Sequence, residues 1–260
     1  MSQTIARPAP AAADPAQPPL GLDIDALNDV FETQTPMQVV AWAAAQFGDQ
    51  LVMSSSFGAE SALLIHMAVQ QRPGIRIIFG DTGYLFPETH QHLEALRRRL
   101  NLNVWTYRTR NDPIAYLQQA GESDSTWRQD VDACCAANKN EPFERAMREL
   151  APAAWLRGIR RQQADTRKTR RILEWSPRYN CYAVSPLLNW TGKEIYAYMK
   201  QHDLPYHPLY EQGYLSIGCN PLSCTRPVQA GEDPRAGRWA GAAKVECGIN
   251  LDNSLDSAKL

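Results

Sequence analysis

Six cysteines are the residues with the clearest capacity for chemistry, and four of them form two pairs. Cys134 and Cys135 are adjacent, Lys139 follows four residues later, and Cys219 and Cys224 lie far along the chain. If the fold brings the two pairs together, they form a four-thiolate site suited to zinc or to an iron–sulfur cluster. A disulfide, or a buried thiol pair with unrelated loop cysteines, is the alternative.

The remaining two cysteines have different surroundings. Cys247 lies in "KVECGIN", with Lys244 close by and a glycine after it. A neighbouring cation favours the thiolate, so an exposed Cys247 is a candidate nucleophile, with an incidental tail thiol as the alternative. Cys181 lies in the apolar stretch "CYAVSPLL" and is predicted to be a core thiol.

Two short polar motifs each follow an apolar stretch. The first, "SSSFGAES", holds Ser54, Ser55, Ser56 and Gly58, small residues that let the backbone curl around an anion at a helix N-terminus. It lacks the Gly-Lys-Ser/Thr ending of a Walker A loop, and a helix cap without a ligand is the alternative. The second is a turn made by Asp81, Thr82 and Gly83, where the carboxylate could hold ribose hydroxyls or a base.

Composition limits the class of ligand. The chain has 260 residues, 44% of them hydrophobic, and a net charge of −1, as in an ordinary globular protein with one large or two small domains. We therefore expect neither nucleic acid nor a membrane as a partner. Arginines cluster over residues 97–99, 157–171 and 226–238, which suits a small anionic ligand.

No stretch is apolar for the roughly 18 residues that a membrane helix needs, and the Pro/Ala-rich start lacks a secretory h-region. We expect a cytoplasmic protein with reduced thiols.

The elements that would position these residues alternate between strand and helix. Apolar runs predict strands within residues 50–56, 74–83, 103–108, 153–159 and 181–188. Helical periodicity and caps predict helices over 24–31, 37–47, 62–70, 87–100, 112–119 and 191–203. The alternation predicts an α/β fold with a doubly wound, mostly parallel sheet. In such sheets ligands bind beyond the carboxyl ends of the strands, where both polar motifs fall.

Three parts of the chain are distinguished. Residues 1–20 are predicted to be a disordered tail, and residues 21–205 a nucleotide-binding α/β domain. Residues 206–260, here the C-terminal segment, are rich in Gly and Pro, have little periodicity and carry three cysteines. An irregular stretch of that length is usually functional.

Together these motifs resemble the assimilatory sulfonucleotide reductases, and most of all the cluster-containing adenylyl-sulfate (APS) reductases. The resemblance covers nearly the whole chain after the tail. It rests on "SSSFGAES", "GDTGYLFPET", the paired cysteines with Lys139, "GIRRQQADTR", and the "SIGC…CTRPV…GEDPRAGRW…KVECGI" segment, in that order. It implies an adenine nucleotide α-hydrolase-like fold.

The resemblance also implies roles for individual residues. Thioredoxin would reduce APS to sulfite and AMP through an S-sulfocysteine at Cys247, in sulfate assimilation and cysteine biosynthesis. Assembly as a homo-oligomer stays open. Substrate would be bound by Ser54, Ser55, Ser56, Gly58, Asp81, Thr82, Gly83, Lys139, Arg160, Arg161, Arg235 and Arg238, and a [4Fe–4S] cluster by Cys134, Cys135, Cys219 and Cys224.

The chain departs from the family pattern at two points. The second cysteine pair is usually C-x-x-C, whereas two further residues separate Cys219 from Cys224 here. Asn250 stands where the family has a His that could assist the thiolate.

Three alternatives are kept. The nearest is reduction of phosphoadenylyl sulfate (PAPS). An ATP-pyrophosphatase-type thiolation enzyme would need a "SGG-x-D-S" loop, which is absent. A redox or metal sensor leaves the arginines without a role.

Overall fold

The computed structural model describes residues 21–110, 130–219, 224–239, 242, 244 and 246–250. Its centre is a six-stranded sheet in the order β3-β2-β1-β4-β6-β5. Neighbouring strands are parallel throughout, except that β5 runs antiparallel to β6. The strands are β1 (Leu51–Ser54), β2 (Arg76–Asp81), β3 (Asn103–Arg108), β4 (Ala154–Leu156), β5 (Leu173–Ser176) and β6 (Cys181–Val184).

The strand order creates a crevice between β1 and β4. From β1 the chain proceeds outward to β3, and it then returns to the other side of β1 as β4. Loops leaving β1 and β4 therefore diverge at their carboxyl ends, which is where open α/β sheets bind ligands. Both strands are almost wholly buried, as expected of central parallel strands.

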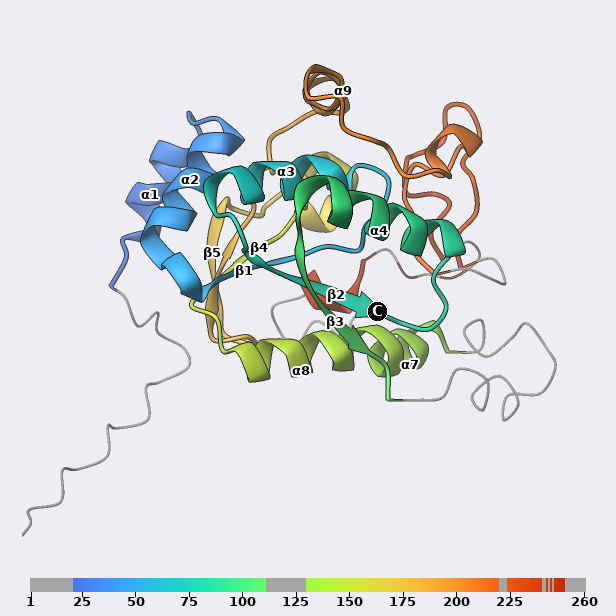
Figure 1. Ribbon diagram of the computed structural model, residues 1–260, viewed down its shortest axis with the longest axis horizontal. Coiled ribbons are helices and arrows are strands. Elements are labelled where there is room, and N and C mark those ends of the chain that lie inside the picture. The colour runs from blue at the N-terminus through green and yellow to red at the C-terminus, as the bar shows by residue number, and fades with distance from the viewer. Residues whose placement is uncertain are drawn as a thin grey trace, which may run out of the picture.

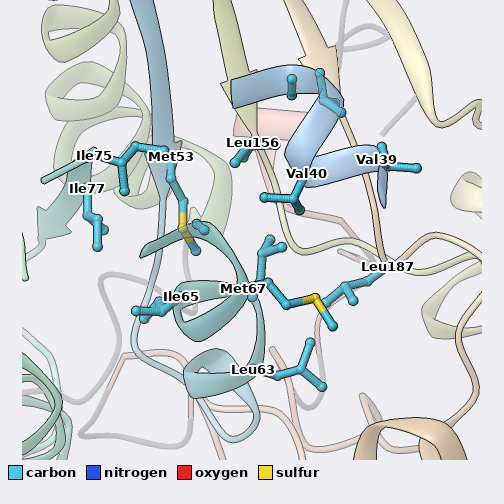
Figure 2. Close-up of a cluster of buried hydrophobic side chains, with 14 of the residues drawn as sticks. Val39, Val40, Met53, Leu63, Ile65, Met67, Ile75, Ile77, Leu156 and Leu187 are labelled. Carbon is cyan, nitrogen blue, oxygen red and sulfur yellow. The ribbon is translucent and has the colours of Figure 1, made fainter. Parts of the chain in front are cut away.

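Helices cover both faces of the sheet (Figure 1). On one face lie α1 (Ile24–Phe31), α2 (Pro36–Phe47), α3 (Ser61–Gln71), α4 (Pro87–Leu100) and α9 (Gly192–Gln201). Buried side chains of these helices and of the sheet form the larger hydrophobic cluster, which includes Val40, Leu63 and Met67 of the helices and Ile77 of β2 (Figure 2). On the other face, α8 (Glu141–Leu150) packs Phe143 against Trp155. The doubly wound α/β prediction is thus confirmed.

Local sequence signals explain several helix starts. Thr35 and Thr191 each accept a hydrogen bond from the backbone of the third helical residue, while Gln38 and Glu194 reach back to the cap. Such reciprocal capping boxes satisfy backbone donors that a helix start leaves open. Strand β5 was missed, because its four residues follow a charged run. The helix predicted over 112–119 lies outside the described residues.

The paired cysteines belong to an unusual helical run. Helix α7 (Val131–Cys135) passes without a break into a π-helical turn (Ala136–Asn140) and then into α8. Pro142, near the start of α8, has no backbone N–H and so cannot continue the α-helical ladder. Single π turns often occur at functional sites. Cys135 itself has ordinary helical angles, so the irregularity begins after the pair.

None of the helices in the described part of the chain combines the length and the apolar character needed to cross a bilayer.

Candidate active site

A cavity of about 270 Å³ lies at the crevice between β1 and β4. Its walls come from the loop after β1, the loop after β4, the π-helical turn and the C-terminal segment. Among the described lining residues, six are basic and two are acidic. The basic ones are Lys139, Arg157, Arg160, Arg167, Arg235 and Arg238, and the acidic ones are Glu60 and Glu246. A cavity with this excess of cations is suited to an anionic ligand.

The serine loop lies where the sequence predicts it. Ser54, Ser55, Ser56 and Gly58 all line the cavity. The Ser55 hydroxyl accepts the backbone N–H of Phe57 at 3.0 Å, and Phe57 adopts a positive φ of 48° with its ring fully buried. The tight curl is thus fixed from below by a packed aromatic ring. No side chain caps the start of α3, where the N–H groups of Ser61 and Leu63 donate to the carbonyls of Gly58 and Glu60 at 3.2 and 3.3 Å.

The second polar motif lies outside the cavity lining and contacts Cys219 through Thr82. Asp81 accepts the backbone N–H of Gly83 at 3.0 Å and pairs with Arg108 at 3.1 Å. The hydroxyl of Thr82 lies 3.3 Å from the Cys219 sulfur. None of the three motif residues lines the cavity, which Gly80 reaches from the same strand.

The two adjacent arginines after β4 point to different places. Arg160 lines the cavity and pairs with Glu60 at 2.6 Å. Burial raises the pKa of Glu60, against the opposing charge of Arg160. Arg161 pairs with Glu32 at 2.7 Å and does not line the cavity. The structure therefore brings only the first of the pair to the site.

A buried carboxylate organises the cavity wall next to Cys247. Glu246 pairs with Arg167 through two contacts of 2.5 and 2.8 Å, lies 3.8 Å from Arg235, and accepts the backbone N–H of Cys247 at 2.7 Å. Burial alone would raise the pKa of Glu246, but the hydrogen bonds and charges of the two arginines hold it at about 2. Burial, then repulsion from Arg167 and Arg238, lowers the pKa of Arg235 to about 10.

Arg238 is held by the backbone and has spare hydrogen-bonding capacity. One guanidinium nitrogen donates to the carbonyl of Ile217 at 3.0 Å. Its Nε is buried and has no hydrogen-bond partner in the described part of the chain. The guanidinium lies over Gly218 so closely that a side-chain carbon there would overlap it. Such an unpaired buried donor is consistent with a site for an anionic ligand.

Lys139 lies between the cysteines and the cavity. Burial, together with Arg238, would lower its pKa. Electrostatic interaction with the nearby sulfurs of Cys247, Cys135 and Cys219 outweighs these effects and raises its pKa. The ammonium group therefore keeps its charge at the junction of the two sites.

The four predicted ligand cysteines gather at one place. Cys134 interacts electrostatically with Cys135 and Cys219, and burial raises its pKa to about 11. Cys219 and Cys224 share a hydrogen bond that lowers the pKa of the first to about 6 and raises that of the second. All four are free thiols. The disulfide alternative is thus not adopted in this structure, although residues 220–223 between the second pair are outside the described part.

The four gathered thiols are donors of the kind that hold iron–sulfur clusters, which are bound by cysteine thiolates. In chemical type the four cysteines therefore fit such a cluster. No group of three or more His, Cys, Asp or Glu side chains in the described residues is arranged to hold one metal ion.

Cys247 is buried, whereas the sequence argument took it to be exposed. It lines the cavity and packs with Cys224 and Trp239. Ion pairing of its neighbour Glu246 with Arg167 pulls the segment inward, which the local sequence could not indicate. Sequence reasoning also missed the cavity residues Trp155, Arg157, Arg167, Trp239 and Glu246. Arg167 was within the recognised arginine-rich stretch, but nothing marked its partner. Cys181 is fully buried, as predicted.

The chain as a whole is similar to known proteins. Residues 50–227 match the model of the phosphoadenosine phosphosulfate reductase domain. The chain is 38% identical to a phosphoadenosine 5′-phosphosulfate reductase of Gloeobacter violaceus, over 90% of this chain and 97% of that one. It is 36% identical to an adenosine 5′-phosphosulfate reductase of Salinibacter ruber, over 92% and 93% respectively.

The fold also matches a solved structure. A crystal structure of phosphoadenylyl-sulfate reductase from Candida auris, in a phosphate complex, superposes with a TM-score of 0.66. The identity is 27%, and the match covers 75% of this chain and 93% of that one.

Proposed function

Because the chain belongs to the phosphoadenosine phosphosulfate reductase family, we propose that it reduces adenylyl sulfate to sulfite and AMP with thioredoxin as reductant. Membership makes it an oxidoreductase of sulfate reduction, and relatives named for either nucleotide match it about equally well. The observation that carries the proposal is the convergence of Cys247, the serine loop and the basic side chains on one cavity.

Substrate binding is assigned to the residues that line the cavity. The serine loop before α3 would take the nucleotide phosphate. Arg160, Arg235 and Arg238 would take the phosphosulfate, because a planar guanidinium pairs with oxyanions bidentately. Thr82, whose hydroxyl contacts Cys219, and its neighbours Asp81 and Gly83 would support the site from outside.

Cys247 would carry out the chemical step. Its thiolate attacks the sulfur of the sulfate group, an S–S bond forms, and AMP leaves with the electron pair of the broken S–O bond. Attack joins two anions, so Lys139 and the arginines stabilise the charge as it moves from sulfur to AMP.

Reduction would follow by thiol–disulfide exchange. One thiol of thioredoxin attacks the Cys247 sulfur, sulfite departs, and the second thiol closes the thioredoxin disulfide and restores Cys247. Because Cys247 is buried in this structure, the exchange requires that its segment leave the cavity.

Cys134, Cys135, Cys219 and Cys224 would hold a [4Fe–4S] cluster. When bound, such a cluster supplies an electrostatic field next to the cavity and ties α7 to the C-terminal segment. Lys139 would be the charged residue between the cluster and the substrate, since it lies near the cluster cysteines and near Arg238 and Cys247 of the cavity.

An assay of sulfite release with APS and with PAPS, in the presence of thioredoxin, tests this proposal. We expect faster turnover with APS, and iron and acid-labile sulfide in anaerobically purified protein. Faster turnover with PAPS would assign the alternative substrate, and absence of both iron and sulfide would refute the cluster.

Asn250 gives a second test of the same site. It lines the cavity, and its carbonyl accepts a hydrogen bond from Arg170 at 2.7 Å. An amide side chain cannot carry a proton, so we expect Asn250→His to change the pH profile of kcat while leaving nucleotide affinity within about threefold.

A further inference from the structure

We propose that Trp239 is a positioning residue, whose indole ring holds Arg235, Arg238 and Lys244 together on the wall shared by the cavity and the cysteine cluster. The proposal rests on the proposed function, because it assigns to these cations the task of binding an anionic nucleotide. Neither the sequence motifs nor the comparisons give Trp239 a role of its own.

The backbone of Trp239 is the first indication that its ring has a specific task. Its φ is +49°, in the left-handed region that a bulky side chain rarely adopts. Its N–H donates to the carbonyl of Cys224 at 2.9 Å, and its carbonyl accepts from Ala242 at 2.8 Å. Strained backbone of this kind persists where the surroundings hold it, and it is concentrated at functional sites.

The conformation places a large ring in a confined position. Only 2% of Trp239 is exposed, although it lines the cavity, and it packs with Cys224 and Cys247. The ring thus touches one residue of each chemical role, a predicted cluster ligand and the predicted nucleophile. An aliphatic side chain could fill the same space, so packing alone does not require an indole.

Three cations around the ring explain why an indole is needed at this position. The side-chain cations of Arg238, Arg235 and Lys244 lie 4.6, 5.7 and 5.8 Å from the ring centroid. Like charges so close together repel one another, and more so where water is excluded. The indole face attracts each of them, because its quadrupole is negative and is the strongest among the aromatic side chains. It therefore offsets repulsion without adding a negative charge that would compete with an anionic substrate.

Each of the three cations has a different further contact. Lys244 pairs with Asp132 on α7, Arg235 lies 3.8 Å from Glu246, and Arg238 donates to the Ile217 carbonyl. The ring therefore joins the cysteine helix, the Cys247 segment and the loop after α9 at one point. Of the three, Arg235 and Arg238 line the cavity.

The test compares variants of Trp239 in a Cys247→Ser background, which binds adenylyl sulfate without turning it over. Trp239→Phe keeps a weaker ring, whereas Trp239→Leu and Trp239→Met keep apolar volume without a π face. We expect calorimetry to show adenylyl sulfate affinity lowered by about threefold in the Phe variant and by about tenfold or more in the other two. Thermal unfolding and iron content are measured alongside.

Two results would overturn the role of the ring. One is an affinity in a folded Leu or Met variant that matches the parent. The other is an equal loss in the Phe, Leu and Met variants, which would assign the effect to volume. The Met variant serves if the Leu variant does not fold. The first result would refute the proposal even if iron were lost at the same time.

Failure of the proposed function has a separate signature. If the native protein reduces neither nucleotide, but adenosine 5′-phosphate still binds and weakens in the order Phe, then Leu and Met, the reductase assignment falls and the ring keeps its role. If APS is reduced while all Trp239 variants bind it alike, only the role of the ring falls.

Discussion

The α/β part of the chain, residues 21–205 and here called the sheet domain, and the C-terminal segment are stabilised by different interactions. In the sheet domain, buried apolar side chains from five helices and the sheet make one continuous cluster (Figure 2). The described end of the C-terminal segment is attached mainly by polar contacts. Glu246 binds Arg167, Lys244 binds Asp132, and arginines 178 and 170 donate to the carbonyls of Gly248 and Asn250 at 2.6 and 2.7 Å.

This difference separates two tasks. Apolar burial is non-directional and cooperative, so the sheet domain gives a stable frame for the serine loop. A few charged contacts can be broken and remade one at a time, which suits the proposal that this segment presents Cys247 first to a nucleotide and then to a reductant. Four predictions address this division, from the largest expected effect to the smallest.

Replacing Cys247 tests the catalytic role proposed for the C-terminal segment. We expect Cys247→Ser to lower sulfite release by about a thousandfold or more, because a neutral hydroxyl is a far weaker nucleophile than a thiolate. Calorimetry should show nucleotide affinity within a few fold of the native value, since the serine loop and the arginines that would bind the nucleotide are unchanged. Sulfite release at the native rate would exclude Cys247 as the nucleophile.

A core substitution tests the frame. Ile77 in β2 is fully buried in the larger cluster. We expect Ile77→Ala to lower the free energy of unfolding by about 2–5 kcal/mol and Ile77→Val by about 0.5–1.5 kcal/mol, measured by urea denaturation. The folded fraction should keep its kcat. A change in kcat greater than the loss of folded protein would mean that the two regions are not independent.

Loss of one charge tests how the segment is attached. Glu246→Gln removes the charge that Arg167 pairs with, so we expect activity to fall by about 10- to 100-fold and proteolysis near residue 246 to accelerate. Global unfolding should change less than in Ile77→Ala. The matched control is Glu32→Gln, which disrupts the half-exposed Arg161 pair and should leave activity within about twofold. Equal activities in both variants would contradict a specific attachment.

Acid should weaken the contact between the C-terminal segment and α4 of the sheet domain. His207 of the segment and His92 of α4 are buried neighbours, with ring centroids 5.3 Å apart. Burial, above all, lowers the pKa of both to about 4 from an ordinary 6.5. The unfolded chain therefore binds protons that the folded protein does not, and the free energy of unfolding should fall as pH decreases from 6.5 toward 4.

Urea denaturation at pH 7, 6 and 5 measures this slope, in a range where carboxylates contribute little. We expect His92→Asn to reduce it. Since burial also lowers the pKa of His66, a smaller slope of the same sign should remain. An identical slope in His92→Asn and the native protein would show that protonation of His92 does not contribute to the pH dependence of unfolding.

The sequence predicted the frame well because its signals are local. Alternating apolar runs and the caps at Thr35 and Thr191 depend on neighbours within a few residues. The serine loop was found for the same reason. Partners distant in the chain could not be found, since nothing near Glu246 indicates that it binds Arg167, or near Arg161 that it binds Glu32. Local signals also gave no reason to expect a buried Cys247.

The π-helical turn at Ala136–Asn140 changes the direction in which the side chains before and after it project from the helix axis. Each α-helical residue advances the direction of its side chain by about 100°. The wider turn changes the angle between the face that carries Cys134 and Cys135 and the face of α8 that packs Phe143 on the sheet. Deleting one residue of the turn would swing the two thiols roughly a quarter-turn around the axis. The additional residue of the π turn thus sets the angle between two faces of one helical run. One face packs on the core, and the other carries the cysteines.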